Sequence, residues 1–447
     1  MKRLASLASI FLILAMLISC STTGEAKPAL SVSDAPEVVE EIDYASSISL
    51  NWSSNTFKEI VTVKSFIDGD TVHFHVPELV NEQGVIKARF LAVNTPESTG
   101  KIEEYGKKAA QFTREKLEGA AEIVIESDTA ELNLDSTGGR YLLWIWYRPE
   151  GSEEYRNLNI ELLQNGLAIA SSSANNSYGS ICMSAIAQAK AFKRNVYSGQ
   201  KDPDFYYGEA VELTLKELRA NTEQYNGIKV AFEGVITKNN NNSVYIEEYD
   251  PETDMYYGIS IYYGYGLSGT GLDILRVGNR SRIVGTLQFY ETGGTYQVSG
   301  LTYRQMKPKD PDNIQKISDG HSGAYVLVDA DTFNNATVEL MDEEGNSKIL
   351  PWADAAMNTT VRMENLEVVD VYTTSDEASS SYGALTLTCK SGDEKINVRT
   401  IVLYDENRNL ITEDVYRGKT IDVVGIVDYF SGENQIKVFS PADIIVH

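Results

Sequence analysis

The sequence predicts an α+β domain with a small antiparallel barrel, followed by two mostly β domains. After Phe57, apolar and polar residues alternate over short stretches, which is the signal of half-buried strands. Helical patterns accompany these stretches up to about residue 200 and are rare beyond it. The later part of the chain contains a β-rich segment that recurs 140 residues further on. A chain of 447 residues has room for about three domains of ordinary size.

The first 20 residues indicate an export signal. Lys2 and Arg3 precede the apolar run LASLASIFLILAML, which suits a secretory signal better than a membrane-spanning helix. The run ends in LISC, which resembles the cleavage box of bacterial lipoproteins. That resemblance implies that Cys20 becomes the lipid-modified first residue of the mature protein. An ordinary cleaved signal, with Cys20 merely nearby, is the alternative.

We therefore expect an exported protein that is lipid-anchored to a bacterial membrane and faces the extracellular or periplasmic side. Residues 21–56 are rich in Ser, Ala, Glu and Thr, and this composition predicts a flexible tether between the anchor and the first domain.

Residues 57–200 are predicted to form the first domain. Strands are expected at FKEIVTVKSFI and TVHFHV, joined by the turn DGD, and at VIKARFLAV, AEIVIES and RYLLWIWYR. Helices are expected at IEEYGKKAAQFTREKLEG, NLNIELLQNGLA and SICMSAIAQAKAFKRNVY. His73 and His75 share one face of a strand. Without a third ligand nearby in the sequence, they indicate its polar face rather than a zinc site.

The β-rich repeat predicts two similar domains, at 205–307 and 323–447. The segment VGNRSRIVGTLQFYETGGTYQV matches RGKTIDVVGIVDYFSGENQIKV, and the match includes two glycines in each copy. We expect each domain to be a five-stranded Greek-key barrel of the oligonucleotide/oligosaccharide-binding (OB) type. The segment KPKDPDN near Pro308 is the expected linker.

Charge separates the two halves of the chain, whose net charge is −25. Residues 57–200 carry 15 Lys and Arg against 19 Asp and Glu, whereas residues 201–447 carry 21 against 39. Affinity for nucleic acids depends on neutralising phosphates with Lys and Arg. The first domain is therefore the better candidate for such a partner, and the partner of the acidic barrels stays open. The stretch MYYGISIYYGYG suits a base-stacking platform, but tyrosine is also an ordinary strand residue.

Two cysteines remain after Cys20, at Cys182 and Cys389. They are expected in different domains, so we expect no structural disulfide between them.

Oxygen-bearing and cationic side chains gather at the predicted strand ends of the first domain. In chain order they are Asp70, Arg89, Asn94, Thr95, Glu97 and Arg140. On one rim of a small barrel, such a group suits phosphodiester hydrolysis. Oxygen ligands hold a hard cation, arginine forks hold the phosphate, and a carboxylate handles the attacking water. Each piece alone also fits an ordinary turn, a strand exit or surface charge.

Together these residues resemble the thermonuclease (staphylococcal nuclease-like) family. That family joins an Asp-Gly-Asp-Thr turn to a strand end Arg-x-x-x-x-Asp-Thr-Pro-Glu and to a later Tyr-Gly-Arg. The similarity runs from about Phe57 to Ser198 and includes EEYGKKAAQFT, GLA and AIAQAKAFKRNVYS. It implies an OB-fold barrel with three helices that cleaves DNA or RNA with the help of Ca²⁺.

The resemblance also implies a role for each matching residue. Asp70, the residue at position 94 and the Thr95 carbonyl would be calcium ligands. Arg89 and Arg140 would hold the phosphate, and Glu97 would orient or deprotonate the water.

Two departures bear on activity. Asn94 stands where the family has its second metal-binding Asp, and the loss of one charge predicts weaker calcium binding and slower turnover. Gly138 stands where the family has a phosphate-contacting Tyr, and IASSSANNSYG lacks the family's base-stacking tyrosines, although Tyr178 is close. The alternative function is a catalytically degenerate domain in a surface lipoprotein that binds oligonucleotide, glycan or protein. A third possibility is that the two later barrels are spacers.

Overall fold

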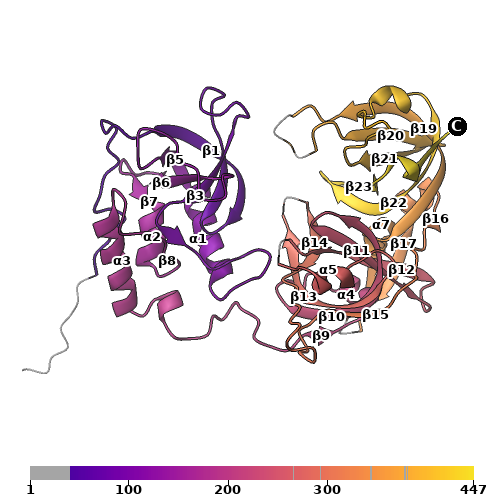
Figure 1. Ribbon diagram of the computed structural model, residues 1–447, viewed down its shortest axis with the longest axis horizontal. Helices are drawn as coiled ribbons and strands as arrows, with labels where there is room; N and C mark the ends of the chain where they lie inside the picture. The colour runs from indigo at the N-terminus through magenta and orange to yellow at the C-terminus, as the bar shows by residue number, and fades with distance from the viewer. Residues whose placement is uncertain (1–40, 265, 292, 343–344, 377–378, 380) are drawn as a thin grey trace, which may run out of the picture. The chain divides into compact units, whose positions relative to one another are not determined.

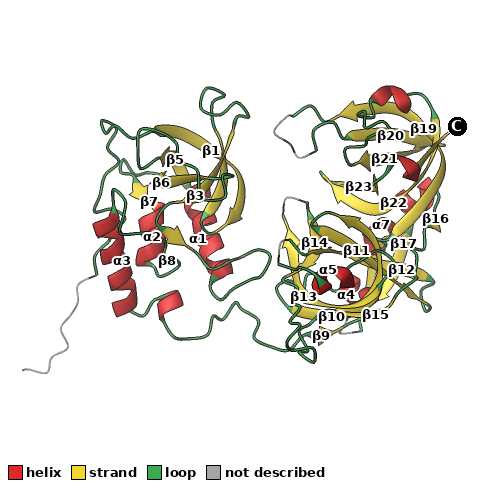
Figure 2. Cartoon of the chain, viewed as in Figure 1, coloured by secondary structure: helices red, strands yellow, loops and turns green. Residues whose placement is uncertain are grey.

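The computed structural model (Figure 1) describes residues 41–447 except 265, 292, 343–344, 377–378 and 380. The predicted signal, the lipidation site Cys20 and most of the predicted tether lie outside the described residues. Strands dominate the described part, and helices are few and mostly short (Figure 2). Within that part, no helix combines the length and apolar character that crossing a membrane requires.

The first barrel has five strands, as the sequence predicts. They are β1 (Lys58–Asp68), β2 (Thr71–His75), β3 (Val85–Phe90), β5 (Ala120–Glu126) and β6 (Tyr141–Pro149). Their order around the barrel is β3-β2-β1-β5-β6, and parallel pairing of β6 with β3 closes it. This connectivity is that of an OB fold. Three shorter strands lie at its margins: β4 (Val93–Asn94), β7 (Arg156–Asn157) and β8 (Ile169–Ala170).

Three helices accompany this barrel: α1 (Gly106–Glu118), α2 (Leu158–Gln164) and α3 (Gly179–Ala191), with the 3-10 turn η1 (Asn195–Tyr197). All three are shorter than the sequence pattern predicts, and α2 ends at Gln164, before the expected NGLA. The helix expected from Ile102 begins only at Gly106, because Tyr105 has a left-handed backbone with φ 65°. The last helix ends at Ala191, before Lys193, whose φ of 50° is also left-handed. Left-handed residues of this kind end a right-handed helix.

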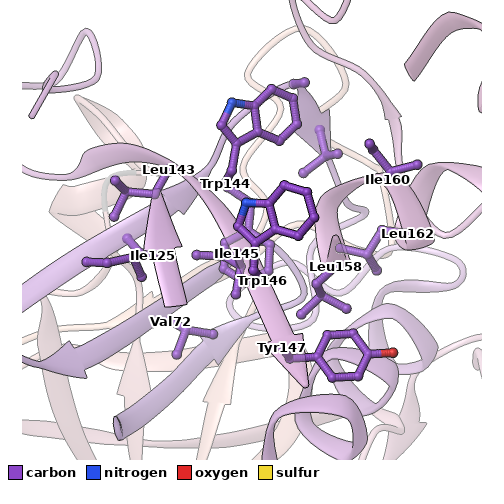
Figure 3. Close-up of a cluster of buried hydrophobic side chains, with 14 of the residues drawn as sticks. Val72, Ile125, Leu143, Trp144, Ile145, Trp146, Tyr147, Leu158, Ile160 and Leu162 are labelled. Carbon is purple, nitrogen blue, oxygen red and sulfur yellow. The ribbon is translucent and has the colours of Figure 1, made fainter. Parts of the chain in front are cut away.

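The core of the first barrel is built around β6 (Figure 3). Five consecutive residues, Leu143 to Tyr147, are buried, because one face of the strand lies inside the barrel and helices cover the other. All seven residues of α2 are buried as well. The rings of Trp144 and Trp146 meet Tyr178 edge-on, at centroid distances of 5.0 and 5.7 Å. Tyr178 is therefore part of the packing rather than a free stacking surface.

Part of the predicted tether is folded. Ala45 is fully buried, and its backbone N–H donates to the Gln164 side chain over 3.0 Å. Asp43 makes an ion pair of 2.7 Å with Arg156. The prediction of a flexible tether over 21–56 is thus wrong for residues 43–56. This segment is polar in composition, yet it makes contacts with α2 and β7.

The second barrel is formed by β10 (Lys229–Asn240), β11 (Ser243–Asp250), β12 (Met255–Tyr262), β13 (Arg280–Tyr290) and β14 (Thr295–Ser299). The third is formed by β19 (Thr360–Thr373), β20 (Leu385–Ser391), β21 (Glu394–Thr400), β22 (Thr420–Phe430) and β23 (Glu433–Val438). Pairings β10–β13 and β19–β22 close them, again with OB connectivity. The predicted OB-type barrels are confirmed.

Smaller elements surround these two barrels. The helices are α4 (Leu215–Ala220), α5 (Thr270–Ile274), α6 (Ala330–Asn335) and α7 (Trp352–Ala355), with the 3-10 turns η2 (Glu413–Val415) and η3 (Pro441–Asp443). The added strands are β9 (Val211–Glu212), β15 (Gln315–Ser318), β16 (Val326–Leu327), β17 (Thr337–Met341), β18 (Ser347–Pro351) and β24 (Ile444–Val446). β15 follows the expected linker closely and pairs with β13.

The repeat has a steric explanation. Gly285 and Gly425 occupy the same place in β13 and β22, and a Cβ on either would lie within 2.6 Å of the neighbouring strand. Gly278 and Gly418 precede these strands with φ of 88° and 69°, which favour glycine. Gly285 and Gly425 therefore mark close contacts between strands, and Gly278 and Gly418 mark turns that precede these strands.

The two cysteines in the described residues are buried in different cores. Cys182 belongs to the core of the first barrel and Cys389 to that of the third.

Candidate active site

Asp70, Arg89, Asn94 and Thr95 meet at one end of the first barrel. Asp70 lies in the tight turn between β1 and β2 and is 4% exposed. Its Oδ2 accepts a hydrogen bond of 2.8 Å from the Thr95 N–H and an ion pair from the Arg89 guanidinium. The second Nη of Arg89 donates to Asn94 Oδ1 over 2.6 Å. One guanidinium therefore joins the carboxylate to the amide that follows β3.

The chain turn after β3 directs Asn94 and Thr95 toward Asp70. Ala92 has a left-handed φ of 70°, which breaks the predicted long strand into β3 and β4. Asn159, fully buried in α2, donates to the carbonyls of Leu91 and Leu143 over 2.8 and 3.0 Å. It thereby ties the end of β3 to β6. Sequence reasoning missed Asn159, although an amide within the apolar stretch NLNIELL was a signal.

The loop from Thr95 to Tyr105 is pressed against the start of α1. A Cβ on Gly106 would lie 2.1 Å from the Glu97 carbonyl oxygen, so only glycine fits there. The Glu103 N–H donates to that carbonyl over 2.9 Å. On the other side, the Thr113 hydroxyl of α1 donates to the Gly69 carbonyl over 2.5 Å. Helix α1 therefore fixes both segments that supply the acidic residues.

Asp68 and Glu97 form an acidic pair beside this cluster. Asp68 is 8% exposed and accepts hydrogen bonds from the Ser98 N–H and hydroxyl over 3.1 and 2.6 Å. Burial raises the pKa of Asp68, although hydrogen bonds from Glu97 and Ser98 oppose the rise. Burial of the carboxyl, the hydrogen bond to Asp68 and the charges of Asp68 and Asp70 raise the pKa of Glu97 to about 7. Glu97 is open to solvent on its outer side, so it can exchange its proton near neutral pH.

Arg140 is engaged elsewhere. Its Nε and Nη2 bond the Asp135 carboxylate over 2.8 and 2.7 Å, within the loop that precedes β6. Burial opposes ionisation of Asp135, but hydrogen bonds from Thr137 and Arg140 hold its pKa at about 2. Among the described residues, no contact links Arg140 to Asp70, Arg89 or Asn94. Sequence reasoning missed Asp135 as its partner.

The turn that carries Arg140 depends on glycine. Gly138 has φ 70°, so a tyrosine at this position would be strained.

The chemistry of the donor set fits a hard cation. Asp70 and Asn94 present their side-chain oxygens to one guanidinium, so these oxygens already converge on a positive charge. The Thr95 carbonyl follows directly, and Thr95 Oγ1 is buried without a hydrogen-bond partner among the described residues. The set holds one carboxylate, however, and in the described residues no three or more His, Cys, Asp or Glu side chains cluster as metal ligands would. Oxygen donors with a single charge suit Ca²⁺ at reduced affinity.

A family model described as staphylococcal nuclease homologue matches residues 87–199. The match covers most of β3, all of β5 and β6 and the three helices, together with Arg89, Asn94, Thr95, Glu97 and Arg140. Strands β1 and β2 precede the matched residues, so the match does not include Asp68 and Asp70. Closure of the barrel places these two residues at the site. The chain therefore carries a domain of the staphylococcal nuclease family, built on the first of its three barrels.

Proposed function

We propose that the protein hydrolyses phosphodiester bonds of DNA or RNA with the help of Ca²⁺. The observation that carries the proposal is the convergence of Asp70, Arg89, Asn94 and Thr95 beside a glutamate whose pKa lies near neutrality. The family of the domain supports a nucleic acid as the substrate.

Each residue has a role in this proposal. Asp70, Asn94 and the Thr95 carbonyl would hold the calcium ion, which supplies Lewis-acid polarisation of the phosphate when bound. Arg89 holds the phosphate through its guanidinium fork. To do so, it has to release at least one of the two oxygens that it now bonds. Ionised Glu97 accepts a proton from the attacking water, whose oxygen bonds to phosphorus as the bond to the leaving sugar oxygen breaks.

A second candidate is a catalytically degenerate domain that binds ligands at the cell surface. Two observations favour it: Asn94 removes one charge from the donor set, and Arg140 is paired with Asp135. In that case the domain binds oligonucleotide, glycan or protein without cleaving it.

We also propose that the chain is exported and anchored through a lipid on Cys20, facing the extracellular or periplasmic side. The basic start, the apolar run and the LISC box support this proposal. The location would give the enzyme access to nucleic acid outside the cell.

The test is digestion of single-stranded DNA and of RNA by the purified protein, with calcium and with a chelator. We expect calcium-dependent cleavage that falls about 10²–10⁴-fold in Glu97→Gln, because the proton acceptor is lost. Asn94→Asp should bind calcium about tenfold more tightly and cleave faster at limiting calcium, because it restores a charged ligand.

Asn407→Asp, on an exposed loop of the third barrel, is the control that adds the same charge elsewhere. If the native chain is inactive and only Asn94→Asp cleaves, the amide silences the site. If neither the native chain nor Asn94→Asp cleaves, the second candidate, a degenerate domain that binds without cleaving, replaces the nuclease as the proposed function.

A further inference from the structure

A row of basic side chains crosses the outer face of β1, β2 and β3. In β2, Val72 and Phe74 are buried inside the barrel, so His73 between them points outward. His73 pairs with Lys87 of β3 and with Ser65 of β1, next to the exposed Lys64. Lys64, His73 and Lys87 are therefore neighbours on three adjacent strands, and we call them the basic row.

The positive charge of the basic row is not compensated within the described chain. Burial lowers the pKa of His73, and the charges of Lys87 and Lys64 lower it further, so both ammonium groups act on this ring. In the part of the chain that the structure describes, neither lysine makes an ion pair. Lys58 and Lys116 of the same domain, by contrast, pair with Glu126 and Glu161.

The basic row leads to the candidate active site. Lys87 and Arg89 are two residues apart in β3 and point to the same face, about 7 Å from each other. Arg89 in turn bonds Asp70 and Asn94. At the opposite end, the loop between β2 and β3 carries Glu78 and Glu82, so the positive stretch does not continue past it.

We infer that the basic row binds the phosphates of a single-stranded nucleic acid that flank the bond at Arg89. The inference rests on the proposed function and adds the course of the strand over β3, β2 and β1. Lysines on an exposed sheet contact phosphates without regard to base, so this face contributes affinity and salt dependence rather than sequence preference. Continuity with Arg89 favours a polynucleotide over an anionic membrane.

The first measurement is binding of a fluorescent single-stranded oligonucleotide to the full chain, by anisotropy, in chelator and over a series of salt concentrations. The double variant Lys64→Gln/Lys87→Gln is compared with Lys190→Gln/Lys193→Gln, which removes two exposed charges near the end of α3. We expect the first variant to bind about tenfold more weakly and its salt slope to fall by about 1.4, because two phosphate contacts are lost. The control should match the native chain, and unchanged thermal unfolding of both variants excludes misfolding.

The second measurement is cleavage with calcium. Lys64→Gln/Lys87→Gln should raise KM for a long single strand and leave hydrolysis of bis(p-nitrophenyl) phosphate unchanged, because that small diester reaches only the central site. A native salt slope and affinity in this variant would overturn the basic row as a binding surface, as would an oligonucleotide that fails to bind the native chain. Retention on phosphatidylglycerol vesicles that depends on both lysines, without any effect on the oligonucleotide, would make the face a membrane contact instead. If the double variant binds the oligonucleotide more weakly but the native chain cleaves nothing, the basic row is a binding surface and the proposed nuclease activity is refuted.

Discussion

At the residue scale, the most consequential contact is between two carboxyls, Asp68 and Glu97. Asp68 is buried and Glu97 is exposed on one side, and the contact acts in opposite directions on the two groups. Asp68 raises the pKa of Glu97, whereas the hydrogen bond from Glu97 favours the ionised form of Asp68. Asp68 is further stabilised by the Ser98 N–H and hydroxyl, which bond the ionised form. The proton that the pair shares near neutrality therefore belongs mainly to Glu97.

This pair predicts the pH dependence of cleavage. A pKa of about 7 means that Glu97 is protonated, and unable to accept a proton, at acid pH, so the rate should rise through about pH 7. Asp68→Asn removes one neighbouring negative charge and should shift this rise in rate to lower pH, because the pKa of Glu97 falls toward its ordinary value. The measurement is kcat/KM against pH at saturating calcium. Asp204→Asn, at an exposed position, is the control. If the rate of Asp68→Asn rises at the same pH as that of the native protein, the pH dependence belongs to a group other than Glu97.

The site was predictable where neighbours in space are also neighbours in sequence. Arg89, Asn94 and Thr95 lie within one strand end, and Asp70 lies in the turn between two expected strands, so one rim of the expected barrel could bring them together. The pKa of Glu97 was not predictable, since it depends on Asp68, which is close only through the closed barrel. The partner of Arg140 was also missed, because Asp135 approaches it through the Gly138 turn rather than through a regular element.

At the element scale, helix α1 is the support of the site. Its first residue, Gly106, lies so close to the Glu97 carbonyl that no side chain fits between them. The Thr113 hydroxyl, from its second turn, donates to the Gly69 carbonyl. A shift of this helix therefore moves Glu97 and the Asp68–Asp70 turn together.

Gly106→Ala should uncouple cleavage from binding of nucleic acid. The added Cβ would push the Glu97 backbone away, and a displacement of about 1 Å costs on the order of 100-fold in rate. Binding of the oligonucleotide in chelator should change little, because the basic row lies on the strands. Gly266→Ala, where the nearest atom to the new Cβ is 3.8 Å away, is the control. Native kcat in Gly106→Ala would show that the loop adapts.

The elements themselves were predicted better than their ends. Alternation revealed the strands of the first barrel, and the repeat revealed that the two later barrels share a fold. Alternation failed to reveal the break at Ala92 and the late start of α1 at Gly106. Both depend on left-handed residues, Ala92 and Tyr105, that sequence patterns do not mark. The folded segment 43–56 was missed because its contacts with Gln164 and Arg156 are polar and distant in sequence.

At the scale of the whole molecule, charge is distributed unevenly between the first domain and the two later barrels. Residues 201–447 carry 21 basic against 39 acidic side chains, which repel a polyanion, whereas the first domain is nearly balanced. Nucleic acid should therefore be held by the first domain rather than by the two later barrels.

Lipid attachment is the prediction that belongs to this scale. Cys20→Ser should release the protein from the membrane fraction and abolish labelling by an alkyne-tagged fatty acid, because the acceptor thiol is gone. Fractionation of expressing bacteria and in-gel detection of the tag measure both effects. Cys182→Ser is the control, since that thiol is buried in the first core. Membrane association that survives Cys20→Ser would mean that another contact holds the chain.

The ion pair between Arg89 and Asp70 has a consequence for the protein without calcium. It supplies a resident counter-ion for a buried carboxylate, so the folded domain does not need calcium to neutralise that charge. The native Tm should therefore rise less with calcium than the Tm of a variant that lacks this arginine. Arg89→Gln leaves Asp70 unpaired, which costs about 3–5 kcal/mol of unfolding free energy, and makes the Tm rise with added calcium. If calcium changes the Tm of neither protein, Asp70 is not a calcium ligand. A larger rise in the variant than in the native protein would show that Arg89 and the metal compete for the Asp70 carboxylate, so that activation exchanges one cation for another.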